Sequence, residues 1–424
     1  MASLHRGKTL KLLHMSRIFI PIFIFWVSVS NATIIKVGKS GFASIKNAIA
    51  SAKAGDTVLV QNAVYQESPI VVDKAICLLG AQMPVLDGQK KFEILIVKAN
   101  NVTIEGFHFK YSGFSGYEDI AGVRLMQCQN VTVKNNHFTH TFFGIYSQHA
   151  VRCSIMKNTF HSTALDETLS GNGIHCWKSD SLIIKGNTIR GHRDGIYFEF
   201  VTNTLISDNL STGNVRYGLH FMFSNDDIYL RNEFIDNGAG VAVMYSKRVT
   251  MLNNTFKFNR GAASYGILLK DISDSHASGN LFEENTVGIF MDGSSRFFIV
   301  SNVFKNNGWA LRIQASCDAI KLSRNNFYSN SFDVATNGSL VLNDFNFNYW
   351  DKYRGYDLDK NGKGDIPFRP VSLFSMITER NTGAMMLFRS TIADLIDQAE
   401  KLIPGLTPED LKDDSPSMKP FNFY

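Results

Sequence analysis

The chain lacks the sequence features by which several large protein classes are identified. Its 424 residues contain only five cysteines, which are odd in number, scattered and without a C-x-x-C pair: Cys77, Cys128, Cys153, Cys176 and Cys317. This pattern argues against a disulfide framework, even in an oxidising compartment. A P-loop, a dinucleotide fingerprint and a nucleophile elbow are also missing, so nothing in the sequence indicates nucleotide hydrolysis.

Outside its N-terminus the chain has almost no excess of positive over negative charge. The net charge is +5, and residues 1–32 contain Arg6, Lys8, Lys11 and Arg17 but no acidic residue, so removing these four leaves the rest near +1. Such a balance does not indicate nucleic-acid binding.

The basic N-terminus leads into an apolar run over residues 18–29, followed by Ser30-Asn31-Ala32. Small residues at positions 30 and 32 fit signal-peptidase cleavage, and the run is short for a membrane span. We expect residues 1–32 to be a signal peptide, with Met15 as an alternative start, and the mature protein to be exported.

What the sequence has in abundance is a repeat of 22 or 23 residues. Each copy opens on a small residue, in the series Gly122, Gly144, Gly173, Gly195, Gly218, Gly240, Gly266, Gly288 and Ala310. Each closes near Asn-x-Phe, in the series Asn136, Asn158, Asn187, Asn209, Asn232, Asn254, Asn280, Asn302 and Asn325. At two places the spacing between successive copies is longer than 23 residues in both series. These longer spacings indicate loop insertions near residues 164–172 and 260–265. A fixed period of this kind indicates a solenoid.

The segments within each repeat are short, β-branched and punctuated by Gly, Asn, Asp and Ser, as strands and turns are. The sequence therefore predicts an all-β fold, a right-handed parallel β-helix with one coil per repeat and coils about 4.8 Å apart. Aliphatic residues after each leading residue should stack inward. The Asn series should form an internal hydrogen-bonded ladder.

The repeat also sets the expected domain boundaries. After the signal peptide, residues 33–120 should form an N-terminal cap and the first coils, 121–345 the regular β-helix, 346–370 an Asp/Gly-rich loop, and 371–424 a C-terminal helical extension. An amphipathic helix over 44–54, with Ser44 as its N-cap and Gly55 after its end, should cap the open end of the solenoid. A second helix is expected over 384–403.

Positions two and four after each leading residue should face outward. Between residues 175 and 244 these positions hold His, Met, Trp, Tyr and Glu rather than bland polar residues. His220, Met222 and Met244 supply imidazole and thioether donors, which suit Cu(I). His175, two coils away, would join them only if the column bends.

Two other interpretations of this column stay open. The column could bind sugars, with Trp177 and Tyr197 stacking on rings and Glu199 or Asp292 acting as carboxylates, helped by His192 and Asp194. Alternatively, Trp177, Tyr197 and Glu199 form a surface covered by the C-terminal segment or by a partner protein.

The loop after residue 356 matches the start of a calcium loop. Asp357, Asp359 and Asn361 place oxygen donors at positions 1, 3 and 5, Gly follows at position 6, and Asp365 adds a further carboxylate. Position 12 is Phe368 rather than Glu, so the loop is not a full EF-hand. A calcium site and an ion-free turn are both compatible with it.

The C-terminal segment is apolar for an appendage. Met385, Met386 and Phe388 lie on its expected helix. They could pack on the solenoid as a cap, or form a surface for a membrane partner.

Several long strings that the repeat does not require resemble the NosD family. They are GNGIHCWKS (171–179), RGHRDGIYFEF (190–200), RYGLHFMFS (216–224), GAGVAVMYS (238–246), ASYGILLKDISDS (263–275), WALRIQAS (309–316), DVATNGS (333–339) and NYWDK (348–352). The resemblance spans roughly residues 33–415. One local departure is Cys176, where an aliphatic residue is expected.

The resemblance implies a periplasmic β-helix protein that is not itself an enzyme. It implies association with an ABC transporter of NosF and NosY type, so that membrane contact is made only through that partner. It also implies cooperation with a NosL-type copper chaperone in assembling the copper–sulfide centre of nitrous-oxide reductase. Either copper or sulfur is compatible as the cargo. The alternative function class is a carbohydrate-binding or carbohydrate-active β-helix of the lyase, epimerase or hydrolase type.

Overall fold

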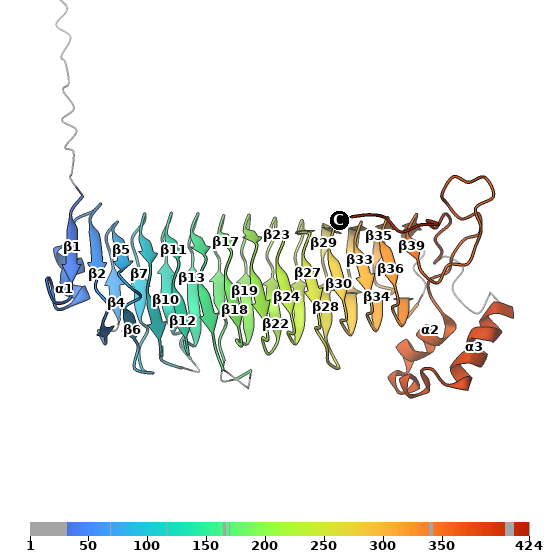
Figure 1. Ribbon diagram of the computed structural model, residues 1–424, viewed down its shortest axis with the longest axis horizontal. Coiled ribbons are helices and arrows are strands. Elements are labelled where there is room, and N and C mark those ends of the chain that lie inside the picture. Colours follow the sequence, from blue (N-terminus) through green and yellow to red (C-terminus); the bar gives the residue numbers. More distant parts are fainter. Residues whose placement is uncertain are drawn as a thin grey trace, which may run out of the picture.

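The computed structural model describes residues 32–67, 69–115, 117–163, 167–168, 170–338, 342–402 and 411–423. The expected signal peptide therefore lies outside the described residues, apart from Ala32. Strands from successive coils form three long parallel sheets, and the coils follow one another along a single axis (Figure 1). This confirms the right-handed parallel β-helix predicted from the repeat.

The first sheet has 14 strands, one from each coil, and all its pairs are parallel. In spatial order its strands are β1 (Ile34–Val37), β2 (Thr57–Val60), β5 (Cys77–Gly80), β8 (Thr103–Glu105), β11 (Thr132–Lys134), β14 (Ser154–Met156), β17 (Ile183–Lys185), β20 (Leu205–Ser207), β23 (Ile228–Leu230), β26 (Thr250–Leu252), β29 (Ser273–Ser278), β32 (Ser295–Val300), β35 (Asp318–Ser323) and β38 (Asp344–Asn346).

The 13-stranded sheet follows the first sheet in each coil. Its strands are β3 (Val64–Tyr65), β6 (Val85–Asp87), β9 (His108–Lys110), β12 (His137–Thr139), β15 (Thr159–His161), β18 (Thr188–Arg190), β21 (Leu210–Thr212), β24 (Glu233–Ile235), β27 (Thr255–Lys257), β30 (Leu281–Glu283), β33 (Val303–Lys305), β36 (Asn326–Tyr328) and β39 (Tyr349–Trp350).

The 12-stranded sheet carries the leading residues of the repeat. Its strands are β4 (Ile70–Val72), β7 (Leu95–Val97), β10 (Ala121–Met126), β13 (Phe143–Gln148), β16 (Ile174–Trp177), β19 (Asp194–Glu199), β22 (Tyr217–Met222), β25 (Ala239–Met244), β28 (Tyr265–Lys270), β31 (Val287–Asp292), β34 (Trp309–Ile313) and β37 (Phe332–Ala335).

The closing asparagines form the predicted internal ladder. Asn254 is buried, and its Oδ1 accepts hydrogen bonds from the backbone N and Nδ2 of Asn232 at 2.9 and 3.0 Å. Its own Nδ2 donates to Asn280 Oδ1 and to the carbonyl of Tyr229, both at 3.0 Å. The same pattern repeats from Asn136 to Asn348. Every amide is therefore satisfied inside the core, which is why this side chain recurs in each coil.

Next to this ladder lies a stack of aromatic rings from the Asn-x-Phe motif. Phe256, Phe282 and Phe304 are fully buried and stack with ring centroids 4.8 Å apart. The leading glycines are needed for the close approach of coils. A Cβ atom at Gly240 would lie 2.5 Å from the carbonyl oxygen of Gly266, a distance that real Cβ atoms do not adopt.

Helix α1 (Ile45–Ser51) covers the N-terminal end of the solenoid (Figure 1). Ser44 is its N-cap, as predicted, and accepts from the backbone N of Asn47. The predicted end at residue 54 is wrong. The Lys74 ammonium donates to the carbonyls of Ile49, Ala50 and Ala52, so the helix closes early and Gly55 plays no part in its end.

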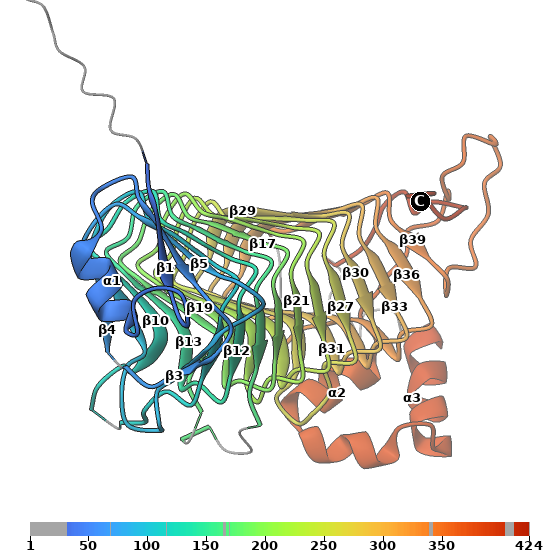
Figure 2. The same cartoon turned by 60° about the vertical axis from the view of Figure 1, so that its left-hand side comes forward.

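The C-terminal helical segment is present, but the single helix predicted over 384–403 is wrong. It is divided into a 3₁₀ helix, η1 (Thr382–Leu387), and helix α3 (Thr391–Leu402). Arg389 between them has a φ of 63°, which a continuous helix does not allow. Helix α2 (Leu373–Arg380) precedes them and was not predicted. In Figure 2 these helices lie beside β31 at the C-terminal end of the solenoid.

Candidate functional site

The register of the 12-stranded sheet brings the predicted outward positions into two columns. In the first, His175 pairs with Tyr197, Tyr197 with His220, and His220 with Ala242. In the second, Trp177 pairs with Glu199, Glu199 with Met222, and Met222 with Met244. The residues between them, such as Phe198 and Phe221, are fully buried. The alternation of a β-strand thus presents both columns on one outer face.

The three leading copper candidates lie together on that face. Met222 and Met244 are direct partners on neighbouring strands, and His220 lies two residues before Met222 on the same strand. Both methionines are partly exposed. Among the described residues, no three His, Cys, Asp or Glu side chains form a metal-binding group, so thioether sulfur would have to complete any site here.

His220 is buried and surrounded by specific groups. Its Nδ1 lies 3.6 Å from Asp194 Oδ2, and the rings of Tyr197 and Tyr217 pack on it with centroids 4.9 and 4.7 Å away. Within the described part of the chain, neither ring nitrogen has a hydrogen-bond partner. The Asp194 carboxylate lies on the Nδ1 side of the ring, and both ring nitrogens are buried.

Asp194 is itself completely buried, and two guanidinium groups balance its charge. Arg193 Nε and Arg216 Nε lie 3.8 and 4.0 Å from its carboxylate oxygens. The backbone N of Tyr217 also donates to Asp194 Oδ1 at 3.3 Å. The two guanidinium groups and the backbone donor thus surround the carboxylate that faces His220.

His175 and His192 differ from His220. Burial, together with the positive charge of Arg193, lowers the pKa of His175 to about 3, and Asn172 Nδ2 lies 3.1 Å from its Nδ1. Burial lowers the pKa of His192 to about 4. Both are therefore neutral imidazoles at physiological pH. The ring of Tyr197 separates His175 from His220, with centroids 4.7 and 4.9 Å away, so the structure does not bring His175 beside the two methionines.

The aromatic side chains proposed for sugar stacking already contact protein groups. Lys178 Nζ lies 4.5 Å from the ring centroid of Trp177, and the ring of His149 packs against it at 4.8 Å. Tyr197 lies between two histidine rings. Stacking of a sugar on either ring would first require these contacts to be displaced.

Sequence reasoning missed a row of exposed aromatic rings beside the methionines. Phe200, Phe223 and Tyr245 directly follow Glu199, Met222 and Met244 in the chain, and are each about 40% exposed. Their rings stack at 5.2 and 5.1 Å. The signal was an aromatic residue at the same position of three successive repeats. This row extends the thioether pair into a larger apolar surface.

The C-terminal helices cover a different part of the same sheet. Glu379 of α2 accepts from Arg312 Nε and Nη2 at 2.9 and 2.7 Å, and from Gln314 Nε2 at 3.0 Å. Met385 and Phe388 pack against Trp309 and Phe332, whereas Met386 is 91% exposed. Of the three C-terminal residues proposed as a partner surface, only Met386 thus points fully to solvent.

In the Asp/Gly-rich loop the carboxylates accept hydrogen bonds from backbone N–H groups of the same loop. Asp357 accepts from the backbone N of Asn361 at 3.0 Å and of Gly362 at 2.8 Å, and Asp365 accepts from that of Leu358 at 2.7 Å. Although desolvation opposes them, these hydrogen bonds hold the pKa of Asp357 below its usual value. Asp359 accepts from Asn361 Nδ2 at 2.7 Å. The arrangement is that of an Asx turn, and calcium binding here stays a prediction.

A family model described as periplasmic copper-binding protein (NosD) matches residues 161–356. A second model, described as right handed beta helix region, matches residues 25–181. The chain is a NosD-type parallel β-helix protein. The NosD match includes His175, His220, Met222 and Met244, and ends just before the calcium-like loop. No curated protein sequence matches the chain.

Solved structures share the fold of this NosD-type protein at low sequence identity. The catalytic domain of a GH87 α-1,3-glucanase in complex with nigerose has a TM-score of 0.59 and 12% identity, over 76% of this chain and 70% of that one. The Dettilon tailspike protein (gp208) has a TM-score of 0.56 and 14% identity, over 70% of this chain. The chain spans 66% of the tailspike's length. The periplasmic alginate epimerase AlgG has a TM-score of 0.50 and 13% identity, over 68% and 76%. At these identities the likeness shows the fold alone.

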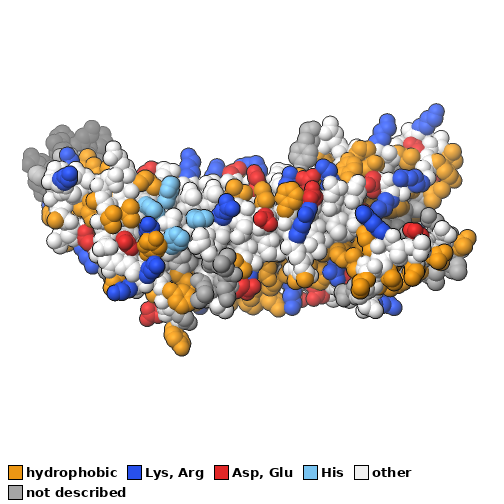
Figure 3. Space-filling view, turned by 60° about the horizontal axis from the view of Figure 1, so that its bottom comes forward, with side chains coloured by type: hydrophobic (Ala, Val, Ile, Leu, Met, Phe, Trp, Pro, Cys, Tyr) orange, Lys and Arg blue, Asp and Glu red, His pale blue; other side chains and the backbone are white. Residues whose placement is uncertain are grey.

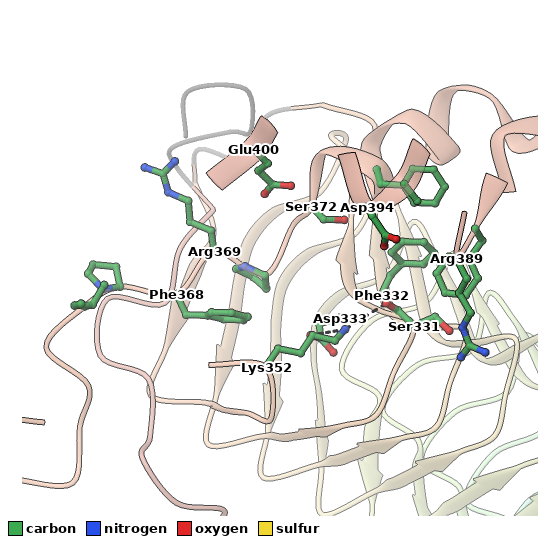
Figure 4. A pocket seen from close by; sticks show the side chains of 16 residues that line it. Ser331, Phe332, Asp333, Lys352, Phe368, Arg369, Ser372, Arg389, Asp394 and Glu400 are labelled. Atoms are coloured by element: carbon green, nitrogen blue, oxygen red, sulfur yellow. Dashed lines mark hydrogen bonds and ion pairs between the residues drawn. The ribbon is translucent and has the colours of Figure 1, made fainter. Parts of the chain in front are cut away.

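A cavity of about 780 Å³ lies away from the methionines, between the last coils and the C-terminal helices (Figure 4). Lys352 reaches across its floor to Asp333, with 3.2 Å between Nζ and Oδ2. Burial raises the pKa of Asp333 despite this ion pair. Phe332 and Phe374 form the apolar part of its wall.

In the described part of the NosD-type chain, no helix is long and apolar enough to cross a membrane.

Proposed function

We propose that this NosD-type protein is a non-enzymatic periplasmic accessory protein for assembly of the copper–sulfide centre of nitrous-oxide reductase. In this role it works with an ABC transporter of NosF and NosY type and a NosL-type copper chaperone. The supporting observation is that a family model described as periplasmic copper-binding covers the whole face that presents His220, Met222 and Met244.

The donor set of this face suits monovalent copper as a transient cargo. Thioether sulfur and imidazole nitrogen are soft to intermediate ligands, and Cu(I) prefers them to the carboxylates that bind harder ions. Met222 and Met244 are partly exposed, so a partner protein can approach them directly. Asp194 orients His220 from the other side. Two partly exposed thioethers beside a buried imidazole favour exchange of the ion over permanent storage.

The test is Cu(I) binding by a variant that loses both thioethers and keeps their volume. Met222→Leu with Met244→Leu preserves apolar packing because Leu and Met are similar in size. Loss of these ligands should weaken Cu(I) binding by at least about tenfold in competition with a chromophoric chelator.

Met126→Leu is the matched control. Met126 occupies the same column, but its neighbour on the next strand is Gln148 rather than a second methionine. If the double variant binds Cu(I) as tightly as wild type, these methionines are not the ligands.

One observation supports the alternative, carbohydrate-directed function. His220, Asp194, Tyr197 and Arg216 together supply groups that acid–base chemistry on an acidic sugar requires. Incubation of the purified protein with acidic polysaccharides tests it. Chain cleavage or epimerisation that is lost in Asp194→Asn would favour this alternative over the copper role.

A further inference from the structure

Histidine is concentrated on one part of the outer surface that the proposed function does not use. Four of the eleven histidines lie on three consecutive coils of the 13-stranded sheet, in β9, β12, the residue after β12, and β15: His108, His137, His140 and His161. Figure 3 shows a group of histidine side chains on the N-terminal part of the visible face. Because these positions face outward, the stacking of the coils does not require imidazole at any of them.

Two of these imidazoles are direct neighbours across the ladder. His137 is the Cα partner of His108, and their ring centroids are 6.3 Å apart with an interplanar angle of 70°. Side chains at paired positions of adjacent parallel strands start about 4.8 Å apart, within the span of two ligands of one metal ion. His137 is exposed, so its ring is free to rotate toward a shared ion.

The surroundings of His108 orient it as a ligand. Its Nε2 lies 2.7 Å from Thr139 Oγ1. A tautomer in which Nε2 donates to this hydroxyl leaves the lone pair of Nδ1 for a metal, and fixing the ring through its other nitrogen is a common feature of metal-binding histidines.

We propose that His108 and His137 form a surface site for a divalent late first-row transition-metal ion, with Cu²⁺ bound most tightly. Imidazole nitrogens suit such ions, and affinity rises along the series to Cu²⁺. No group of three or more His, Cys, Asp and Glu ligands exists among the described residues, so the protein supplies two nitrogens and water completes the coordination. The site is therefore open and exchangeable, and it differs in donor type and in sheet from the thioether pair.

The test is Cu²⁺ titration of the untagged full chain, followed by pulsed electron paramagnetic resonance to detect imidazole nitrogens. His108→Gln with His137→Gln should bind Cu²⁺ at least about tenfold more weakly and should lose the two-imidazole signature. Binding to wild type should fall on acidification, because protons and the metal compete for the same nitrogens. Thermal unfolding followed by circular dichroism checks that the variants keep the fold. Because His137 is exposed, His137→Gln alone should fold normally and should remove one of the two imidazole nitrogens from the spectrum.

Two controls separate this site from other copper-binding groups. His149→Gln with His276→Gln removes two histidines from other parts of the surface and should leave the signal unchanged. Met222→Leu with Met244→Leu should also retain it, so the Cu²⁺ site and the proposed Cu(I) role are tested separately. The proposal is overturned if the His108/His137 double variant keeps wild-type affinity and spectrum, or if the signal is lost in the His149/His276 control instead.

Discussion

Adjacent residues in each coil face opposite environments, and this alternation explains which of them could be identified from the sequence. The period of the repeat gives the inward asparagines and the outward His175–Met244 columns, because strand geometry places every second side chain on one face. It does not give the approach of Asp194 to His220, which depends on side-chain conformation where the strand begins. The exposed row of Phe200, Phe223 and Tyr245 was present in the repeat but lay one position beyond the columns considered.

The asparagine ladder leads to a prediction about stability. Asn254→Ala removes four hydrogen bonds inside the core, and with them the side-chain oxygen to which the backbone N of Asn232 donates. Unsatisfied buried groups of this kind cost about 2–4 kcal/mol of unfolding free energy in total. Denaturant unfolding measures the loss. Asn47→Ala, at an exposed position in α1, should be neutral, and an equally small effect at Asn254 would show that the ladder contributes little.

At the scale of elements, the strands followed from the sequence more closely than the helices did. Strand positions repeat many times, so each is fixed by its equivalents in other coils. A helix occurs once, and its end depends on partners far along the chain. Lys74 ends α1 in this way, and α2 is held by the ion pair between Glu379 and Arg312. Sequence periodicity carries no information about such contacts.

The C-terminal tail supplies an unexpected end to the asparagine ladder. Residues 411–423 run back along the last coils (Figure 1), and Asp413 takes the place of the next asparagine. Its carboxylate accepts from the backbone N of Phe347 and Asn348 at 2.9 and 2.8 Å, and from Trp350 Nε1 at 3.0 Å. The final coil is thereby closed by a residue that the repeat does not contain.

Two substitutions of Asp413 should distinguish the contribution of its hydrogen-bond acceptors from that of its negative charge. Asp413→Ala removes the acceptor of two buried donors, Asn348 N and Trp350 Nε1, and should cost about 2–3 kcal/mol, whereas Asp413→Asn keeps one acceptor oxygen for them and should cost less. Burial raises the pKa of Asp413, so the folded state binds this proton more readily and stability should fall as pH rises through that pKa. The Asn variant should lack this decline. Equal losses in both variants at neutral pH, measured by denaturant unfolding, would argue against the capping role.

At the scale of the whole molecule, the solenoid is a linear array whose two ends are covered and whose middle is open. Helix α1 covers one end, and α2, η1 and α3 lie against the last strands of the 12-stranded sheet (Figure 2). The column from His175 to Met244 lies upstream of the Glu379–Arg312 contact. The C-terminal segment that the sequence offered as a possible cover thus contacts Trp309, Arg312 and Phe332 instead.

We propose that Cu(I) binds to the face of the 12-stranded sheet through Met222, Met244 and His220. Copper K-edge X-ray absorption of the Cu(I)-loaded protein measures the donor atoms directly. We expect sulfur scatterers together with an imidazole nitrogen in wild type, and loss of the sulfur contribution in Met222→Leu with Met244→Leu. A wild-type spectrum with nitrogen and oxygen donors alone, or sulfur scattering that persists in the double variant, would contradict it.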